Sequence, residues 1–131
     1  MKKISGKFEV AMSPLASDVN SENNAFARMG LEKTYFGDLS GTSQGEMLSV
    51  RTAEAGSAGY VAIELVQAIL DGKSGEFALQ HNGVMSSPGQ SLQVQVIPDS
   101  GTNGLKGLKG EIAIRIEDGV HYYDFEYDLS A

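Results

Sequence analysis

Apolar and polar residues alternate along most of the chain with a period of two, the pattern of β-strands that bury one face. In the segment 111–117, EIAIRIE, every second residue is an isoleucine. In the segment 120–129, VHYYDFEYDL, His121, Tyr123 and Phe125 share one face, opposite Asp124 and other acidic residues. The pattern predicts eight strands, over 6–12, 26–38, 39–52, 59–70, 76–85, 91–97, 111–117 and 120–129.

The connections between these segments are mostly short. Asp71-Gly72 and Asp118-Gly119 are hairpin signals, Pro14 is expected to end the first strand, and the polar stretches 13–24 and 86–90 are expected to be loops or turns. The glycine-rich stretch 98–110 has room for one turn of helix. Short connections favour antiparallel neighbours in sequence order. We therefore predict a single all-β domain over 1–131.

The predicted architecture is an eight-stranded antiparallel up-and-down, or meander, β-barrel, because closing eight strands into a ring removes the exposed edges. A two-sheet sandwich is the alternative architecture. Its Greek-key connections would need longer loops than most of those in this sequence. An eight-stranded barrel has an interior just wide enough for side chains or for one small ligand.

Composition narrows the classes of function. The net charge of −7 repels phosphate backbones and anionic lipid surfaces, so we expect neither nucleic acid nor a membrane as a partner. The chain has no cysteine, which excludes disulfides and thiolate chemistry and fits a cytoplasmic protein. No apolar run has the length of a membrane-spanning helix, and the start of the chain does not read as a signal peptide.

The strand 59–70 contains GYVAIELV, an apolar run with a carboxylate, Glu64, at its centre. Either Val61, Ile63 and Leu65 face the interior, or Tyr60, Glu64 and their alternate neighbours do. We favour the second orientation, which leaves an apolar stripe on the outside. Such a stripe marks a subunit interface, so we predict a homo-oligomer, with a dimer favoured.

An inward Glu64 needs polar partners, because an unpaired buried carboxylate is costly. The candidates on other strands and its own are Tyr60, His81, His121, Tyr123, Lys33 and Arg51. Alternation places both histidines on interior faces, and Glu46 shares a face with Leu48 and Val50 that could also point inward. The candidate ligand-binding residues are Glu46, Tyr60, Glu64, His81, His121 and Tyr123.

These residues fit three functions. The first is binding of a small, largely apolar molecule in the barrel interior. The second is an isomerase or cyclase-like enzyme that uses Glu46 or Glu64 with Tyr60 and a histidine for acid–base catalysis. The third is a structural or interaction domain with a filled core. No spacing of His and carboxylate residues supports a metal site, and we expect no cofactor.

The stretches GEMLSVRTAEAGSAGYVAIELVQAILDGKSGEFALQHNGVM, VIPDSGTNGLKGLKGEIAI and HYYDFEYDL resemble a family of small bacterial proteins of unknown function. That family is grouped with the allene oxide cyclase-like β-barrels. The similarity spans residues 4–130, and SAGYVAIE and LQH are its most specific parts. The resemblance implies an antiparallel barrel that usually self-associates and has no established activity.

Overall fold

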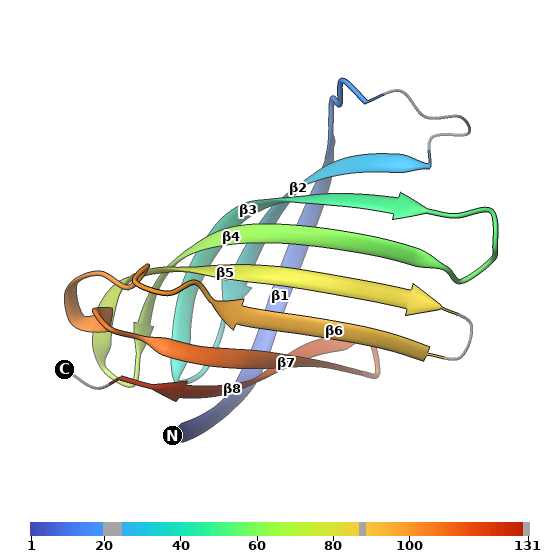
Figure 1. Ribbon diagram of the computed structural model, residues 1–131. Coiled ribbons are helices and arrows are strands. Elements are labelled where there is room, and N and C mark those ends of the chain that lie inside the picture. The colour runs from blue at the N-terminus through green and yellow to red at the C-terminus, as the bar shows by residue number, and fades with distance from the viewer. Residues whose placement is uncertain (20–24, 87–88, 130–131) are drawn as a thin grey trace.

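The computed structural model describes residues 1–19, 25–86 and 89–129, which form a closed barrel of eight antiparallel strands in sequence order. In Figure 1, β3, β4, β5 and β6 run side by side across the near side, and β1 crosses behind them. The strands are β1 (Lys2–Leu15), β2 (Phe26–Tyr35), β3 (Leu39–Arg51), β4 (Ala58–Leu70), β5 (Lys73–Ser86), β6 (Gly89–Val96), β7 (Lys109–Glu117) and β8 (Val120–Asp128). The predicted meander barrel is confirmed, and the sandwich alternative is excluded.

Strand β1 is longer at both ends than the alternation predicts. Its first half pairs with β8, from Lys2 to Phe8, and its second half pairs with β2, from Phe8 to Leu15. The prediction that Pro14 ends the strand is wrong. Pro14 lies in the half of β1 that pairs with β2 alone, so its missing N–H can face the unpaired edge, where proline is tolerated.

The other predicted strands are found close to their expected bounds, and a single turn of 3₁₀-helix, η2 (Asn103–Leu105), lies in the glycine-rich stretch as predicted. The expected connections over 13–24 and 86–90 include residues 20–24 and 87–88, which lie outside the described residues. Among the residues that are described, no helix is long and apolar enough to span a membrane.

One half of the barrel interior is packed with large side chains. Leu105, the last residue of η2, and Leu108, three residues further on, are fully buried members of this cluster. Aromatic rings pack closely within it; those of Phe77 and Phe125 are stacked with centroids 6.2 Å apart. The cluster contains Phe8, Tyr35, Leu39, Val66, Ala68, Leu70, Phe77, Leu79, Val94, Val96, Leu105, Leu108, Ile112, Tyr123, Phe125 and Tyr127.

Tyr123 ties β8 to the turn between β2 and β3. Its ring is fully buried, and its hydroxyl donates to the carbonyl oxygen of Phe36 at 2.8 Å and accepts from the N–H of Leu39 at 3.1 Å. The side chain reaches this turn by crossing β1 at Gly6, where an added Cβ would lie 2.5 Å from the Tyr123 hydroxyl. A glycine at this position is therefore required for the contact.

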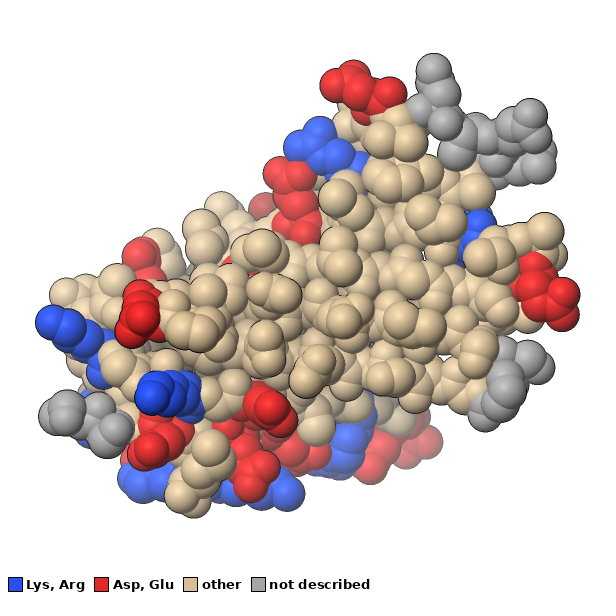
Figure 2. Space-filling model, in the orientation of Figure 1, with Lys and Arg blue, Asp and Glu red and all other residues tan. Residues whose placement is uncertain are grey.

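The outer surface of the barrel is apolar over β3, β4 and β5. Strand β4 has the orientation that we favoured: Ala62, Glu64 and Val66 are buried, while Val61 and Ile63 are exposed. Figure 2 shows this face, where charged side chains lie around the margin and not in the middle.

The Tyr123 contact can be tested by replacing Tyr123→Phe, which removes only the hydroxyl. We expect the free energy of unfolding to fall by about 1–3 kcal/mol, because the buried Leu39 N–H loses its acceptor. Urea denaturation followed by circular dichroism measures this change.

The matched control is Tyr122→Phe, because no hydrogen bond of the described residues involves the Tyr122 hydroxyl and its ring contacts Arg115 instead. Equal stability of the two variants would contradict the proposed role of the Tyr123 hydroxyl.

Candidate functional site

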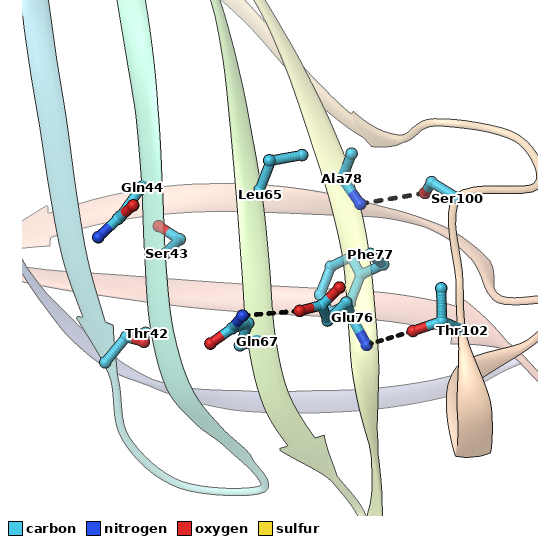
Figure 3. Close-up of a pocket in the computed structure, with 10 residues that line it drawn as sticks. All are labelled: Thr42, Ser43, Gln44, Leu65, Gln67, Glu76, Phe77, Ala78, Ser100 and Thr102. Carbon is cyan, nitrogen blue, oxygen red and sulfur yellow. Dashed lines mark hydrogen bonds between the residues drawn. The ribbon is translucent and has the colours of Figure 1, made fainter.

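A polar depression on the outside of the barrel, between β3, β4, β5 and the segment 97–102, is the first site to consider (Figure 3). Several of its polar groups already have partners. Gln67 donates to Glu76 at 2.6 Å, and Ser100 and Thr102 accept hydrogen bonds from the backbone N–H groups of Ala78 and Glu76 at 3.0 Å. These contacts attach the segment 97–102 to the edge of β5, so the depression serves the fold.

The interior of the barrel offers a better site. A cavity of about 420 Å³ occupies the half that the packed cluster does not fill, and Tyr60, Ala62, Lys33, His81 and His121 are among the residues that line it. The boundary between the two halves can be followed along β4, where residues before Glu64 line the cavity and those after it belong to the packed core. Glu64 therefore lies where the cavity meets the core.

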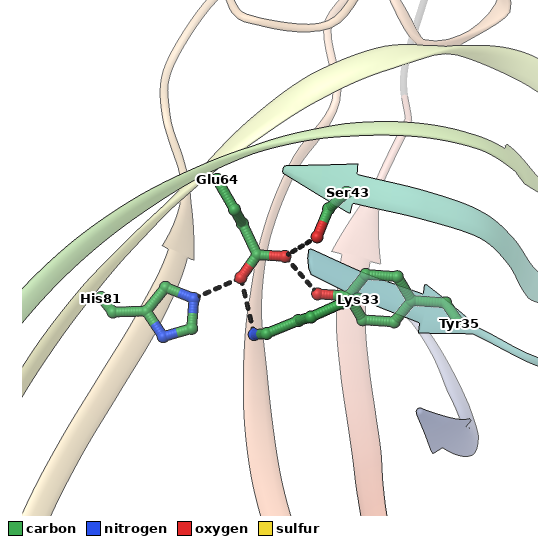
Figure 4. A network of polar contacts seen from close by, with 5 residues as sticks. All are labelled: Lys33, Tyr35, Ser43, Glu64 and His81. Carbon is green, nitrogen blue, oxygen red and sulfur yellow. Dashed lines mark hydrogen bonds and ion pairs between the residues drawn. The ribbon is translucent and has the colours of Figure 1, made fainter. Parts of the chain in front are cut away.

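Glu64 is fully buried, and its carboxylate accepts four hydrogen bonds (Figure 4). Oε1 accepts from the hydroxyl of Tyr35 and from Oγ of Ser43 at 2.8 Å. Oε2 lies 2.7 Å from Nζ of Lys33 and 2.6 Å from Nε2 of His81. Because a carboxylate has about four lone-pair positions, Glu64 has no capacity left for a ligand.

Glu64 and these partners come from four neighbouring strands. Lys33 and Tyr35 lie on β2, Ser43 on β3, Glu64 on β4 and His81 on β5. Gly45 makes the arrangement possible, because it lies directly across from Glu64 in the β3–β4 pairing. An added Cβ at Gly45 would lie 2.1 Å from the carbonyl oxygen of Ile63 and 2.9 Å from the Cβ of Glu64.

The electrostatics keep Glu64 ionised. Burial alone would raise its pKa, but the hydrogen bond from His81 and the charge and hydrogen bond of Lys33 outweigh burial and, with Tyr35, hold the pKa at about 2. The pKa of Tyr35 is raised well above its usual value by burial and by the negative charge of Glu64. Tyr35 therefore stays protonated and acts as a donor.

The ionised carboxylate also sets the state of His81. A carboxylate can only accept, so Nε2 of His81 carries the hydrogen and Nδ1 is left for other partners. Lys33 has three N–H donors and uses one on Glu64, while its ammonium lies 5.1 Å from the centre of the Phe8 ring. Lys33 and His81 both line the cavity, whereas Glu64 lies behind them.

The sequence-predicted residues divide into three groups. His81, His121 and Tyr60 line the cavity, and Glu64 holds its floor, as the inward orientation of β4 requires. Tyr123 faces inward as predicted, but it lies in the packed half with its hydroxyl already bonded to the β2–β3 turn.

The prediction that Glu46 points inward is wrong. Glu46 is exposed on the outside of β3 and forms an ion pair with Arg28 at 2.7 Å. Leu48, on the same face, is exposed as well, because the inward face of β3 is the one that carries Ser43, Gly45 and Met47. This face is small and weakly apolar, so hydrophobicity alone pointed to the wrong side.

Of the partners considered for Glu64, Lys33 and His81 are confirmed, and Arg51 is exposed at the end of β3. Tyr35 and Ser43 were missed. Tyr35 could have been found from the sequence, because its two-residue spacing from Lys33 places both side chains on the same face of the strand. Ser43 could have been found only with the register of β3. Among the described residues, no three His, Asp or Glu side chains gather as metal ligands would.

The Glu64 cluster predicts a specific dependence of stability on pH. The folded-state pKa of about 2 lies below the ordinary value of 4.5, so this stabilisation is complete above pH 4.5 and is lost as the pH falls towards 2. We expect Glu64→Gln to cost about 3 kcal/mol at neutral pH, and the difference from wild type to shrink across this window. Urea denaturation over the same pH range measures both quantities.

Glu46→Gln is the control, since it removes a carboxylate from an exposed ion pair and should change stability by less than about 1 kcal/mol. A constant difference between wild type and Glu64→Gln from neutral to acid pH would contradict the ionised state of Glu64.

Comparison with known proteins agrees with the geometry. No match was found among curated protein sequences. The crystal structure of a protein of unknown function from the DUF3224 family of Shewanella oneidensis MR-1 matches with a TM-score of 0.96 and 45% sequence identity, over 100% of this chain and 98% of that chain. The family model described as "Protein of unknown function (DUF3224)" matches residues 4–127. The chain therefore belongs to the DUF3224 family.

Proposed function

We propose that this protein binds a small, largely apolar molecule in the open half of the barrel, with an oxygen atom of the ligand against Lys33 and His81. The observation that carries the proposal is a cavity of about 420 Å³ whose largely apolar lining includes the ammonium of Lys33, a donor, and the imidazole of His81 beside it. Ligand sites commonly combine apolar walls with a few fixed polar groups that orient the bound molecule.

The walls supply most of the expected affinity. They come from several strands and include flexible methionine side chains, which can adapt to the shape of a ligand. Removing apolar ligand surface from water contributes about 25 cal/mol per Å². The apolar lining residues include Val10, Met12, Leu31, Met47, Leu92 and Ile114.

The floor supplies the orientation. Nζ of Lys33 and Nε2 of His81 converge on the same oxygen of Glu64, so the two groups lie side by side. Glu64 is not among the lining residues, whereas Lys33 is, and Lys33 has two N–H donors that Glu64 does not use. An oxygen acceptor on the ligand, such as a carbonyl, hydroxyl or carboxylate oxygen, complements this floor better than a cationic group does.

A ligand can reach the cavity between β6 and β7. The pairing of these strands covers two positions, Val94 with Ile112 and Gln95 with Glu111. Leu92 and Ile116, which lie beyond the paired positions, line the cavity from the two sides. We propose this stretch, where the described residues of β6 and β7 are not paired, as the route by which a ligand enters the cavity.

Acid–base catalysis by a carboxylate has less support than binding. Among the described residues that line the cavity there is no Asp or Glu, because Glu46 lies outside and Glu64 lies behind Lys33 and His81. A carboxylate with a pKa of about 2 is also a weak base. The isomerase or cyclase-like function would need a residue other than these two carboxylates as its base.

The proposal is tested with octanol, octanoate and octylamine, which share one apolar chain and differ in the polar end. We expect octanol and octanoate to raise the melting temperature and to bind in isothermal titration calorimetry, and octylamine to do neither. A ligand at a hundred times its dissociation constant should stabilise the protein by about 2.7 kcal/mol.

Ala62→Leu should abolish binding, because Ala62 lines the cavity and a larger side chain would fill it. The matched control is Ala113→Leu, which makes the same change at an exposed position of β7. The proposal fails if Ala62→Leu binds as wild type does, or if neither these compounds nor a broad metabolite library shifts the melting temperature.

A further inference from the structure

The outer face of β3, β4 and β5 carries an unusual number of exposed aliphatic side chains. Outward positions on β4 are occupied by Val61, Ile63, Leu65 and Ile69, with only Gln67 polar among them. The aliphatic face consists of Leu48, Val50, Val61, Ile63, Leu65, Ile69 and Val84, each between 42% and 65% exposed. Monomeric proteins rarely leave a contiguous apolar surface of this kind uncovered.

Charge is distributed around this face and not across it (Figure 2). The chain has a net charge of −7, so two copies repel each other when charged surfaces meet. At one margin, Arg28 and Glu46 neutralise each other at 2.7 Å. Neutral amides, Gln44 and Gln80, accompany the aliphatic residues around a shallow groove along β3 and β4.

We propose that this aliphatic face is the interface of a homodimer, in which β4 of one copy packs against β4 of the other about a two-fold axis. An isologous contact requires a surface that complements itself. Aliphatic and amide side chains meet this requirement without bringing like charges together. The Arg28–Glu46 pair also meets it, since it presents both signs of charge to a symmetry-related copy.

The shape of the face fits the same arrangement. From Val61 to Ile69 the aliphatic row on β4 extends about 26 Å along the strand. Leu48 on β3 and Val84 on β5 widen the row on both sides, so β4 is its midline. The β4 side chains form a ridge, and a shallow groove lies beside it towards β3. In a two-fold dimer the ridge of each copy can enter the groove of the other.

A partner of different chemistry fits less well. A basic protein would be attracted to the acidic side chains at the margin and not to the uncharged centre. Anionic lipid attracts basic residues, and none of the seven residues of the aliphatic face is basic. A measurement of mass in solution distinguishes these alternatives from a homodimer. Pure protein without a basic partner or lipid has the mass of two chains only if it forms a dimer with itself.

The first experiment is analytical ultracentrifugation across a dilution series. We expect wild type to sediment with twice the 13.9 kDa mass of the chain, and Ile63→Lys/Leu65→Lys to sediment as a monomer. Ala113→Lys, which adds a charge to the outside of β7, should remain a dimer. Monomeric wild type overturns the proposal, as does a double variant that keeps the wild-type mass. Flotation of monomeric wild type with phosphatidylserine vesicles would overturn it in favour of a lipid surface.

A second variant tests the two-fold axis even if the lysine variants fold poorly. The chain has no cysteine, so Ile63→Cys introduces the only thiol. Across a two-fold axis near the midline of the face, mild oxidation should link two copies through this residue. Ala113→Cys is the control and should stay unlinked. Equal cross-linking of the two variants, or none at Ile63→Cys in a solution dimer, would exclude this axis.

Discussion

The buried carboxylate of Glu64 is the constraint on which the rest of the interior depends. A charge in that position is tolerated only while all its partners are present, because its burial without them would cost several kcal/mol. Side chains alternate along a strand, so a shift of one residue in β2 or β5 would turn Lys33 or His81 to the outside. The four bonds to Glu64 therefore specify the register of β2, β3, β4 and β5.

The carboxylate of Glu64 also lies between the packed half of the barrel interior and the half that contains the cavity. Beyond it, phenylalanine, tyrosine and leucine side chains interlock with η2 and leave no room for a ligand. Before it, the residues that line the cavity include small or flexible ones such as Ala62 and Met47. Lys33 and His81 lie at the boundary between the cavity and the packed core. Each makes one hydrogen bond to Glu64, and each still has donor or acceptor capacity for a ligand.

The sequence was sufficient to predict the barrel, since alternation with a period of two is imposed by any strand with one buried face. It also placed His81 inside, because Phe77 and Leu79 share its face. It failed for Glu46, where exposed Leu48 and Val50 imitate a buried face, and for the role of Tyr123, whose partners are 84 to 87 residues away. Such contacts depend on how the ring closes, and local patterning carries no information about closure.

Strand β4 explains why an apolar run has a charge at its centre. Most half-buried strands keep charge outside and aliphatic residues inside. β4 has aliphatic residues on both faces, with Glu64 inside among Ala62 and Val66, and with Val61, Ile63 and Leu65 outside. The inward side chains of β4 pack and bond within the chain, whereas the outward aliphatic side chains remain in contact with water. Burying that apolar surface would contribute a free energy of about 25 cal/mol per Å². Covering them requires a surface from outside this chain. Because successive residues of β4 point to opposite sides, changes to the outer face leave the Glu64 cluster intact, and the two proposals can succeed or fail independently.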